Sequence, residues 1–95
     1  MEITATPEFK RWLDALRDLR GRARVQARIQ RLANGNPGDH RVLTGGVCEL
    51  RVDVGPGYRV YYTQHGNTLV ILLIGGDKAT QKSDIKKAQE LARQL

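Results

Sequence analysis

The sequence predicts an α+β fold, in which a mostly antiparallel sheet is packed by helices, on the basis of three patterns. Apolar residues recur with helical spacing in the first third of the chain and again near its end. Residues 48–63 alternate between apolar and polar side chains, which is typical of strands with one buried face. Residues 69–74 form an unbroken apolar run before Gly75-Gly76, which predicts a central strand buried on both faces.

The N-terminal third predicts a short strand and a helical hairpin. Residues 1–5 alternate like a strand, and Thr6-Pro7-Glu8 is typical of a helix start, with a hydroxyl at the N-cap and proline in the first turn. Two apolar stripes follow, separated by a break near residues 18–21, and the second ends at the helix stop Asn34-Gly35. The stripes consist of Phe9, Trp12, Leu13, Leu16, Val25, Ile29 and Leu32.

The alternating segment predicts a hairpin around Gly55-Pro56-Gly57. If Val54 opposes Tyr58, three polar side chains share the face away from the apolar residues of the hairpin: Arg51, Arg59 and Tyr61. The same register places Asp53 opposite Arg59, so a cross-strand ion pair is a purely structural interpretation of these charges.

The remaining elements complete a single predicted domain over residues 1–95. A candidate strand at Val42-Leu43 precedes the hairpin, and a turn at residues 65–67 connects the hairpin to the buried strand. A polar turn then leads to a last helix that begins around Ser83-Asp84. The expected order is one strand, two helices, a three-stranded meander and a C-terminal helix.

The chain is strongly basic. Its 95 residues include 16 Lys and Arg against 10 Asp and Glu, so the formal net charge is +6, and the pI is about 10.0. An excess of this size favours a polyanion or an acidic protein as partner, although a merely soluble basic domain has the same composition. Aromatic residues make up 5% of the chain, which disfavours stacking platforms for single-stranded nucleic acid.

Cysteine content and hydropathy indicate a reduced, cytoplasmic protein. Cys48 is the single cysteine, which excludes an intramolecular disulfide and a cysteine-based zinc site. The N-terminus lacks the pattern of a signal peptide, and no apolar run approaches the ~20 residues that span a membrane. His40 and His65 lack carboxylates at ligand spacing, so neither a metal nor a cofactor is expected.

The second predicted helix carries the densest charge. Five arginines fall within twelve residues that contain no acid: Arg20, Arg22, Arg24, Arg28 and Arg31. The spacing puts Arg24, Arg28 and Arg31 on one helix face, where planar guanidiniums suit contacts to phosphate. The alternative is the solvated outer face of an amphipathic helix, and the sequence supports both interpretations about equally.

Two segments together resemble the RelE/ParE superfamily of bacterial toxins. These are ELRVDVGPGYRVYY (Glu49 to Tyr62) and LLIGGDKATQKSDIKKA (Leu72 to Ala88). The similarity extends over nearly the whole chain and is greatest to the addiction-module killer branch, which is related to HigB toxins and to a phage Gp49-related group. It implies a RelE-like fold and the toxin role in a type II toxin–antitoxin pair.

The resemblance also implies partners and an activity. Many such toxins cleave mRNA in the ribosomal A site, and a cognate antitoxin, often with a helix-turn-helix domain that binds DNA, neutralises them by direct binding. The expected partners are therefore the ribosome, mRNA and an antitoxin in a hetero-oligomer, with no membrane. The expected reaction is metal-independent RNA cleavage, in which the 2′-hydroxyl attacks phosphorus and leaves a 2′,3′-cyclic phosphate.

This reaction needs cations for the phosphorane charge, a proton donor and a proton acceptor. Arg59, Arg51 and Lys78 are the predicted catalytic residues, and Arg59 ranks first because the family often has a functional arginine in the corresponding segment. The predicted RNA- or ribosome-binding residues are Lys82, Gln81, Tyr61, Arg22, Arg24, Arg28 and Arg31. Some members of the superfamily have a histidine or tyrosine near the end of the chain, and this sequence has neither there. The remaining candidates for the base are Glu49, Tyr61 and His65.

Two other functions fit the sequence. A ParE-like toxin shares the fold and inhibits DNA gyrase, and it needs no RNA-cleaving site. A basic module that binds RNA or an acidic protein without chemistry predicts an affinity that falls steeply with salt and no cleaved product. Neutralising Arg51, Arg59 and Lys78 discriminates the ribonuclease from the gyrase inhibitor, because it should abolish RNA cleavage and need not affect gyrase inhibition.

Overall fold

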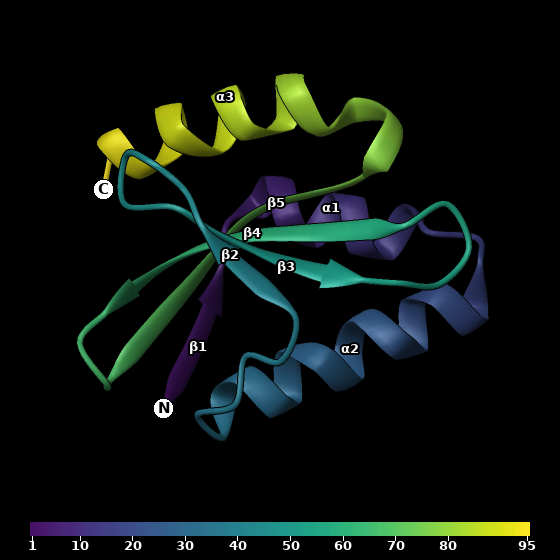
Figure 1. Ribbon diagram of the computed structural model, residues 1–95, viewed down its shortest axis with the longest axis horizontal. Coiled ribbons are helices and arrows are strands. Elements are labelled where there is room, and N and C mark those ends of the chain that lie inside the picture. The colour runs from purple at the N-terminus through teal and green to yellow at the C-terminus, as the bar shows by residue number, and fades with distance from the viewer.

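Five strands form one mixed sheet, and three helices pack on its two faces, in the computed structural model, which describes residues 1–95 (Figure 1). The strand order is β1-β5-β4-β3-β2; β1 runs parallel to β5, and every other neighbouring pair is antiparallel. The elements are β1 (Glu2–Ala5), α1 (Pro7–Ala15), α2 (Leu19–Ala33), β2 (His40–Val42), β3 (Cys48–Val52), β4 (Tyr58–His65), β5 (Leu69–Asp77), a 3₁₀ turn η1 (Lys78–Thr80) and α3 (Gln81–Arg93). The predicted α+β class is confirmed.

The antiparallel part of the sheet has four strands, one more than the expected meander. The candidate strand at Val42-Leu43 is the three-residue edge strand β2, which pairs with β3. The centre of the sheet is β4, whereas the sequence suggested β5. As its apolar run predicts, β5 has a strand on each side and is covered on both faces.

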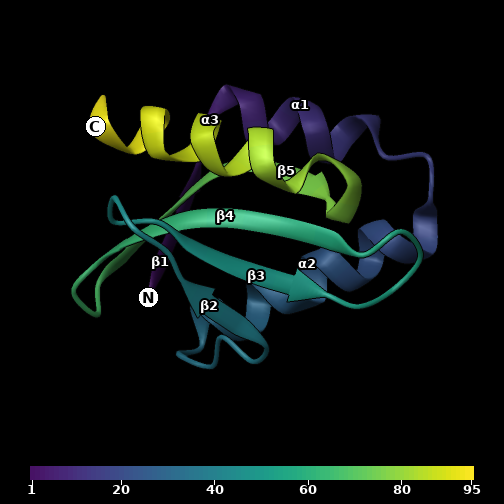
Figure 2. The same ribbon diagram turned by 45° about the horizontal axis from the view of Figure 1, so that its top comes forward.

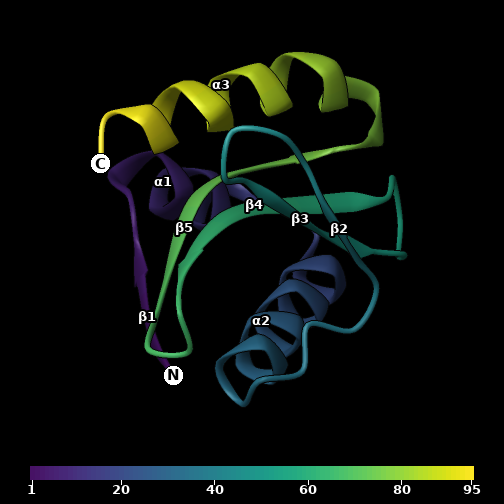
Figure 3. The ribbon, with the colours of Figure 1, turned by 60° about the vertical axis from the view of Figure 1, so that its left-hand side comes forward.

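The two faces of the sheet carry separate cores. Helices α1 and α2 pack on one face, and α3 packs on the other, mainly on β4 and β5. Figure 3 shows α2 and α3 on opposite sides of the sheet. The larger core, beneath α1 and α2, contains Phe9, Val25, Leu32, Leu50, Val52, Tyr58, Val60, Tyr62, Val70 and Leu72. The smaller core, beneath α3, contains Val47, Tyr61, Leu73, Ala88 and Leu91. No helix combines the length and apolar character that crossing a membrane requires.

Gly75 and Gly76 lie inside β5, although the sequence predicted that they end the strand. Both are needed because β5 passes between two helices (Figure 2). A Cβ atom at Gly75 would overlap the indole of Trp12 in α1, and one at Gly76 would overlap the carboxylate of Asp84 in α3. These glycines therefore allow close packing of helices on both faces, rather than a turn.

The hairpin register differs from the expected one by two residues. Val52, not Val54, opposes Tyr58, so β3 ends earlier and the loop is longer. Backbone hydrogen bonds from Val54 N to Val52 O (2.9 Å) and from Gly57 N to Val54 O (3.1 Å) close this loop. Asp53 consequently lies outside the ladder, and the ion pair proposed for it with Arg59 is absent. A shift of two leaves every side chain on its predicted face.

The helix starts follow local hydrogen bonding. Thr6 is the N-cap of α1 as predicted, and its Oγ1 accepts a hydrogen bond from Phe9 N at 3.1 Å. The last helix begins at Gln81, earlier than the predicted Ser83-Asp84. The reason is that Asp77 caps the preceding turn η1, with Oδ1 accepting from Ala79 N at 2.8 Å.

Candidate functional site

The sheet brings Arg51, Arg59 and Lys78 together, and we refer to these three residues as the cationic cluster. Arg51 and Arg59 are directly opposite each other on β3 and β4, on the face that α3 packs against. Arg59 and Lys78 both lie beside Gly57: a Cβ there would be 3.5 Å from Arg59 Nη1 and 3.5 Å from Lys78 Cβ. The three predicted catalytic residues therefore lie at the same end of the sheet, with Lys78 Cβ next to the side chain of Arg59.

Arg59 has no acidic partner. Its Nη1 donates hydrogen bonds to the carbonyl oxygens of Gly57 (3.2 Å) and Tyr58 (3.1 Å), while its Nε is buried without an acceptor. No carboxylate lies within 4.0 Å of Arg59 or Lys78. Two cations without a counterion, beside a third, attract an anion to this surface.

Glu49 is completely buried beside the cluster and interacts with three side chains. Its Oε1 accepts a hydrogen bond from Arg51 Nε at 3.2 Å and pairs with Arg41 Nε at 3.4 Å. Its Oε2 accepts from Gln81 Nε2 at 2.8 Å, which ties the first residue of α3 to β3. Burial alone would raise the pKa of Glu49, but the hydrogen bonds from Gln81 and Arg51 and the charge of Arg41 together lower it.

Arg41 is the residue of this region that the sequence did not indicate. It lies opposite Glu49 in β2, an edge strand of three residues that is too short for a clear alternation. An acidic residue in β3 with an arginine in the neighbouring strand is the only signal, and it appears once the strand pairing is known.

Tyr61 is fully buried, although it is among the residues predicted from the sequence to bind RNA or the ribosome. It points to the predicted face, but α3 covers that part of the sheet, and Tyr61 packs in the core with Ala88 and Leu91. Its hydroxyl makes no hydrogen bond of standard geometry, but it lies close enough to Glu49 for the two groups to shift each other's pKa. Burial, and secondly the charge of Glu49, raise its pKa.

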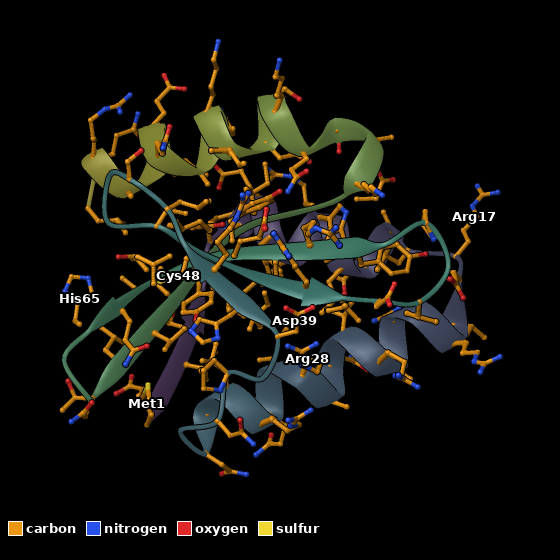
Figure 4. All side chains as sticks on the ribbon, viewed as in Figure 1. Met1, Arg17, Arg28, Asp39, Cys48 and His65 are labelled. Carbon is orange, nitrogen blue, oxygen red and sulfur yellow. The ribbon has the colours of Figure 1, made fainter.

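The α2 arginines lie on the opposite face of the sheet from α3, and they are not equivalent. Arg28 donates hydrogen bonds to three carbonyl oxygens, from Pro37 and Asp39 (both 2.9 Å) and from Arg51, so its guanidinium joins α2 to the sheet (Figure 4). This arginine is engaged inside the fold rather than on an open face. Arg22 pairs with Asp14 at 3.4 Å, whereas Arg20, Arg24 and Arg31 are exposed.

Of the other predicted residues, Gln81 and Lys82 lie at the start of α3 and His65 lies far from the cationic cluster. Gln81 is bound to Glu49, and Lys82 is exposed on the first turn of α3. His65 is exposed at the far end of β4 (Figure 4). Six residues of extended chain separate it from Arg59, which is about 20 Å. His65 therefore cannot act as a base at this cluster.

The cationic cluster is an open surface rather than a pocket. The groove of about 410 Å³ lies between α1 and α2, on the other face, and it is lined by residues such as Phe9, Leu13 and Ile29. No hollow of the surface is lined by Arg51, Arg59 or Lys78. An open cationic surface suits a long polyanion better than a small molecule, which proteins usually enclose.

Comparison with known proteins assigns the family. Residues 11–95 match the family described as phage derived protein Gp49-like (DUF891). An uncharacterized protein of Haemophilus influenzae is 50% identical over 95 residues, which cover all of this chain and 96% of that protein. The cationic cluster, Glu49 and Arg41 all lie within the matched residues. Because both matches extend over most or all of the chain, the protein belongs to the phage-derived Gp49-like family.

Proposed function

We propose that the protein is the toxin of a type II toxin–antitoxin pair and inhibits translation by cleaving mRNA on the ribosome. The observation that carries this proposal is the direct pairing of Arg51 with Arg59, two cations side by side on an open surface. Lys78 adds a third charge, and neither it nor Arg59 is neutralised by a carboxylate. Membership of the Gp49-like family, together with the resemblance to RelE/ParE toxins, supports RNA as the polyanion.

The proposed reaction needs no metal ion. The 2′-oxygen of the ribose forms a bond to the adjacent phosphorus, and the bond between phosphorus and the 5′-oxygen breaks. The products are a 2′,3′-cyclic phosphate and a 5′-hydroxyl. Arg51 and Arg59 stabilise the negative charge that grows on the phosphorane oxygens, because their guanidiniums are already held in place by the sheet. Lys78 donates a proton to the departing 5′-oxygen.

The proton of the 2′-hydroxyl passes to solvent in this proposal. Tyr61 is buried with a raised pKa, so it is a poor proton acceptor. The lowered pKa of Glu49 makes its carboxylate a weak base. Rate enhancement therefore comes from charge stabilisation and from positioning of the RNA by the ribosome, rather than from a paired acid and base.

A cognate antitoxin completes the proposal. The resemblance implies a protein that binds the toxin directly and carries a helix-turn-helix domain. Co-expression of the adjacent open reading frame should restore growth, and the two proteins should co-purify. Arg59→Ala should co-purify with the same partner, since its defect concerns RNA chemistry and not antitoxin binding.

The experiment that tests the function is induction of the protein in cells, followed by mapping of mRNA 5′ ends and measurement of plasmid supercoiling. The wild-type protein should produce new 5′ ends within translated codons, and Arg59→Ala should not. Arg11→Ala is the matched control, because Arg11 is an exposed arginine of α1 on the opposite face of the sheet. Intact transcripts with altered supercoiling would instead support gyrase inhibition, and intact transcripts with normal supercoiling would support a binding module.

A further inference from the structure

We propose that Glu49 holds Arg41 and Arg51 as a two-armed phosphate clamp, in which Arg41 contacts the RNA backbone directly and Glu49 is the positioning residue for both arginines. The phosphate clamp consists of these three residues. The inference rests on the proposed function for the identity of its ligand, a phosphodiester group of RNA. It adds to the cationic cluster a binding residue from β2 and a role for the buried carboxylate.

The first observation is the way in which the two arginines approach Glu49. Both do so through Nε, and both approach the same carboxylate oxygen, Oε1, at 3.2 Å from Arg51 and 3.4 Å from Arg41. The other oxygen is occupied by Gln81 Nε2 at 2.8 Å. The carboxylate therefore has little freedom to rotate. It holds the inner edge of the Arg51 guanidinium by a hydrogen bond and that of the Arg41 guanidinium by an ion pair.

The second observation is that the outer edges of both guanidiniums are free. Of all the guanidinium nitrogens of Arg41 and Arg51, only Arg51 Nε donates a hydrogen bond within the protein. The terminal nitrogens of both side chains donate none. The side chains are 44% and 37% exposed, whereas Glu49 has no exposed surface. A planar guanidinium held at Nε presents its two terminal nitrogens outward, in the geometry that binds phosphate oxygens.

The third observation is the charge balance. Two guanidiniums share one carboxylate, so the phosphate clamp keeps a net positive charge, and Arg59 lies directly opposite Arg51 on the next strand. An anion at the clamp is therefore attracted, not repelled. Arg41 is opposite Glu49 on β2, and Arg51 follows Glu49 by two residues on the same face of β3, about 7 Å further along the strand. RNA bound at the clamp would continue toward Arg59 and Lys78.

Positioning of the two arginines explains the buried carboxylate of Glu49 better than a contribution to stability does. A buried ion pair adds little to stability, because the loss of hydration offsets the attraction between the charges. Two arginines that extended freely into solvent would lose much side-chain entropy on binding a phosphate. Arginines already held by Glu49 lose less, and their affinity for the anion is correspondingly higher.

The test measures binding of a short fluorescein-labelled single-stranded RNA by anisotropy at several salt concentrations. Arg41→Ala should weaken binding about fivefold and reduce the slope of log affinity against log salt by about 0.7, the value for one phosphate contact on a single strand. Arg41→Lys should bind no better than Arg41→Ala, because the single ammonium would pair with Glu49 and leave nothing for the phosphate. If Arg41→Lys binds like the wild type, a diffuse charge suffices and the clamp is wrong.

Glu49→Gln distinguishes the phosphate clamp from a diffuse basic surface, because the two predict opposite changes in RNA affinity. This variant is more positive by one charge, so a diffuse basic surface should bind RNA more tightly. The clamp predicts weaker binding, by about fivefold, because the two guanidiniums lose their fixed orientation. Circular dichroism melting shows whether the variant is folded. If it is not, the exposed Arg41 variants decide the question by themselves.

The outcomes separate this inference from the proposed function. Wild-type cleavage that is lost in Arg59→Ala but unchanged in Arg41→Ala and Glu49→Gln would overturn the clamp and leave the ribonuclease intact. Binding that follows the clamp predictions without any RNA cleavage would keep the clamp and overturn the ribonuclease. A wild-type protein with no affinity for the labelled RNA would overturn the clamp.

Discussion

Arg51 and Arg59 face each other directly across β3 and β4, so two like charges occupy one cross-strand pair. Such a pair is unfavourable for the sheet, by a few tenths of a kcal/mol to about 1 kcal/mol. Arg51 is compensated by Glu49, whereas Arg59 has no carboxylate partner and its Nε is buried without an acceptor. An unfavourable local arrangement of this kind is expected where side chains bind a ligand rather than support the fold.

The first prediction follows from this pair. Arg59→Met should abolish RNA cleavage while its free energy of unfolding stays within about 1 kcal/mol of the wild type or rises, since removal of the second charge offsets the lost hydrogen bonds to Gly57 and Tyr58. Urea denaturation and a cleavage assay on the same preparation provide the measurement. A loss of stability well above this range would mean that Arg59 serves the fold.

The second prediction concerns Tyr61. Tyr61→Phe should retain RNA cleavage, because the hydroxyl is buried under α3 and reaches no substrate. The free energy of unfolding should change by less than about 1 kcal/mol, since the hydroxyl makes no hydrogen bond of standard geometry. Loss of cleavage in a folded Tyr61→Phe protein would contradict this account and restore the tyrosine as a candidate base.

The third prediction separates structural from exposed arginines in α2. Arg28→Ala should lower the free energy of unfolding by about 3 kcal/mol, because the carbonyl oxygens of Pro37, Asp39 and Arg51 lose a charged donor. Arg31→Ala is the matched control one helical turn away, and it should change stability by no more than about 0.5 kcal/mol. Equal effects of the two substitutions in urea denaturation would show that Arg28 does not join α2 to the sheet.

The fourth prediction concerns Gly75. Gly75→Ala should destabilise the protein by about 3 kcal/mol, because the added methyl group overlaps the indole of Trp12 and overpacked cores relax only in part. The double variant with Trp12→Leu should recover at least about 1 kcal/mol relative to the sum of the two single variants. A purely additive double-mutant cycle would contradict the direct contact.

The fifth prediction is a dependence of stability on pH. The pKa of Glu49 is lowered in the folded protein, so its ionised form contributes stability that is complete above the ordinary value of about 4.5 and is lost as the pH falls through the folded value. The difference in Tm between pH 7 and pH 3 should therefore be larger for the wild type than for Glu49→Gln. Asp18, whose pKa is lowered by hydrogen bonds from Gly21 and Tyr58, contributes equally to both proteins and cancels. Identical pH profiles would show that Glu49 is not stabilised as an anion.

Hydrophobic periodicity predicts most of the fold because burial decides which face of each element turns inward. The stripe from Phe9 to Leu16 and the run from Leu69 to Ile74 both form the expected elements. The register of the β3–β4 hairpin is different, since a shift of two residues leaves every side chain on its face and the pattern cannot detect it. The sequence therefore predicts that Arg51 and Arg59 share a face, but not that they are partners.

The sequence predicts those candidate site residues that are recognisable from a single strand or turn, but not those that depend on contacts between elements. The sequence predicts Lys78 as a site residue because it follows the most apolar strand, and Arg59 because it lies on the polar face of a clear hairpin. The sequence does not indicate Arg41, because β2 has only three residues and shows no clear alternation. The interaction of Arg41 with Glu49 depends on the pairing of β2 with β3. The sequence does not distinguish Arg28 from Arg31, because both lie on the same helix face. The carbonyl oxygens of Pro37 and Asp39, which accept hydrogen bonds from Arg28, lie next to it only in the folded protein.

The chemistry of the RNA ends tests the central claim most directly. Purified protein should be incubated with ribosomes carrying a defined mRNA, in the presence of enough EDTA to remove trace transition metals but with magnesium retained for the ribosome. The wild type and Arg11→Ala should produce fragments with a 2′,3′-cyclic phosphate and a 5′-hydroxyl, and Arg59→Met should produce none. Fragments with a 5′-phosphate, or equal cleavage by Arg59→Met, would contradict the central claim.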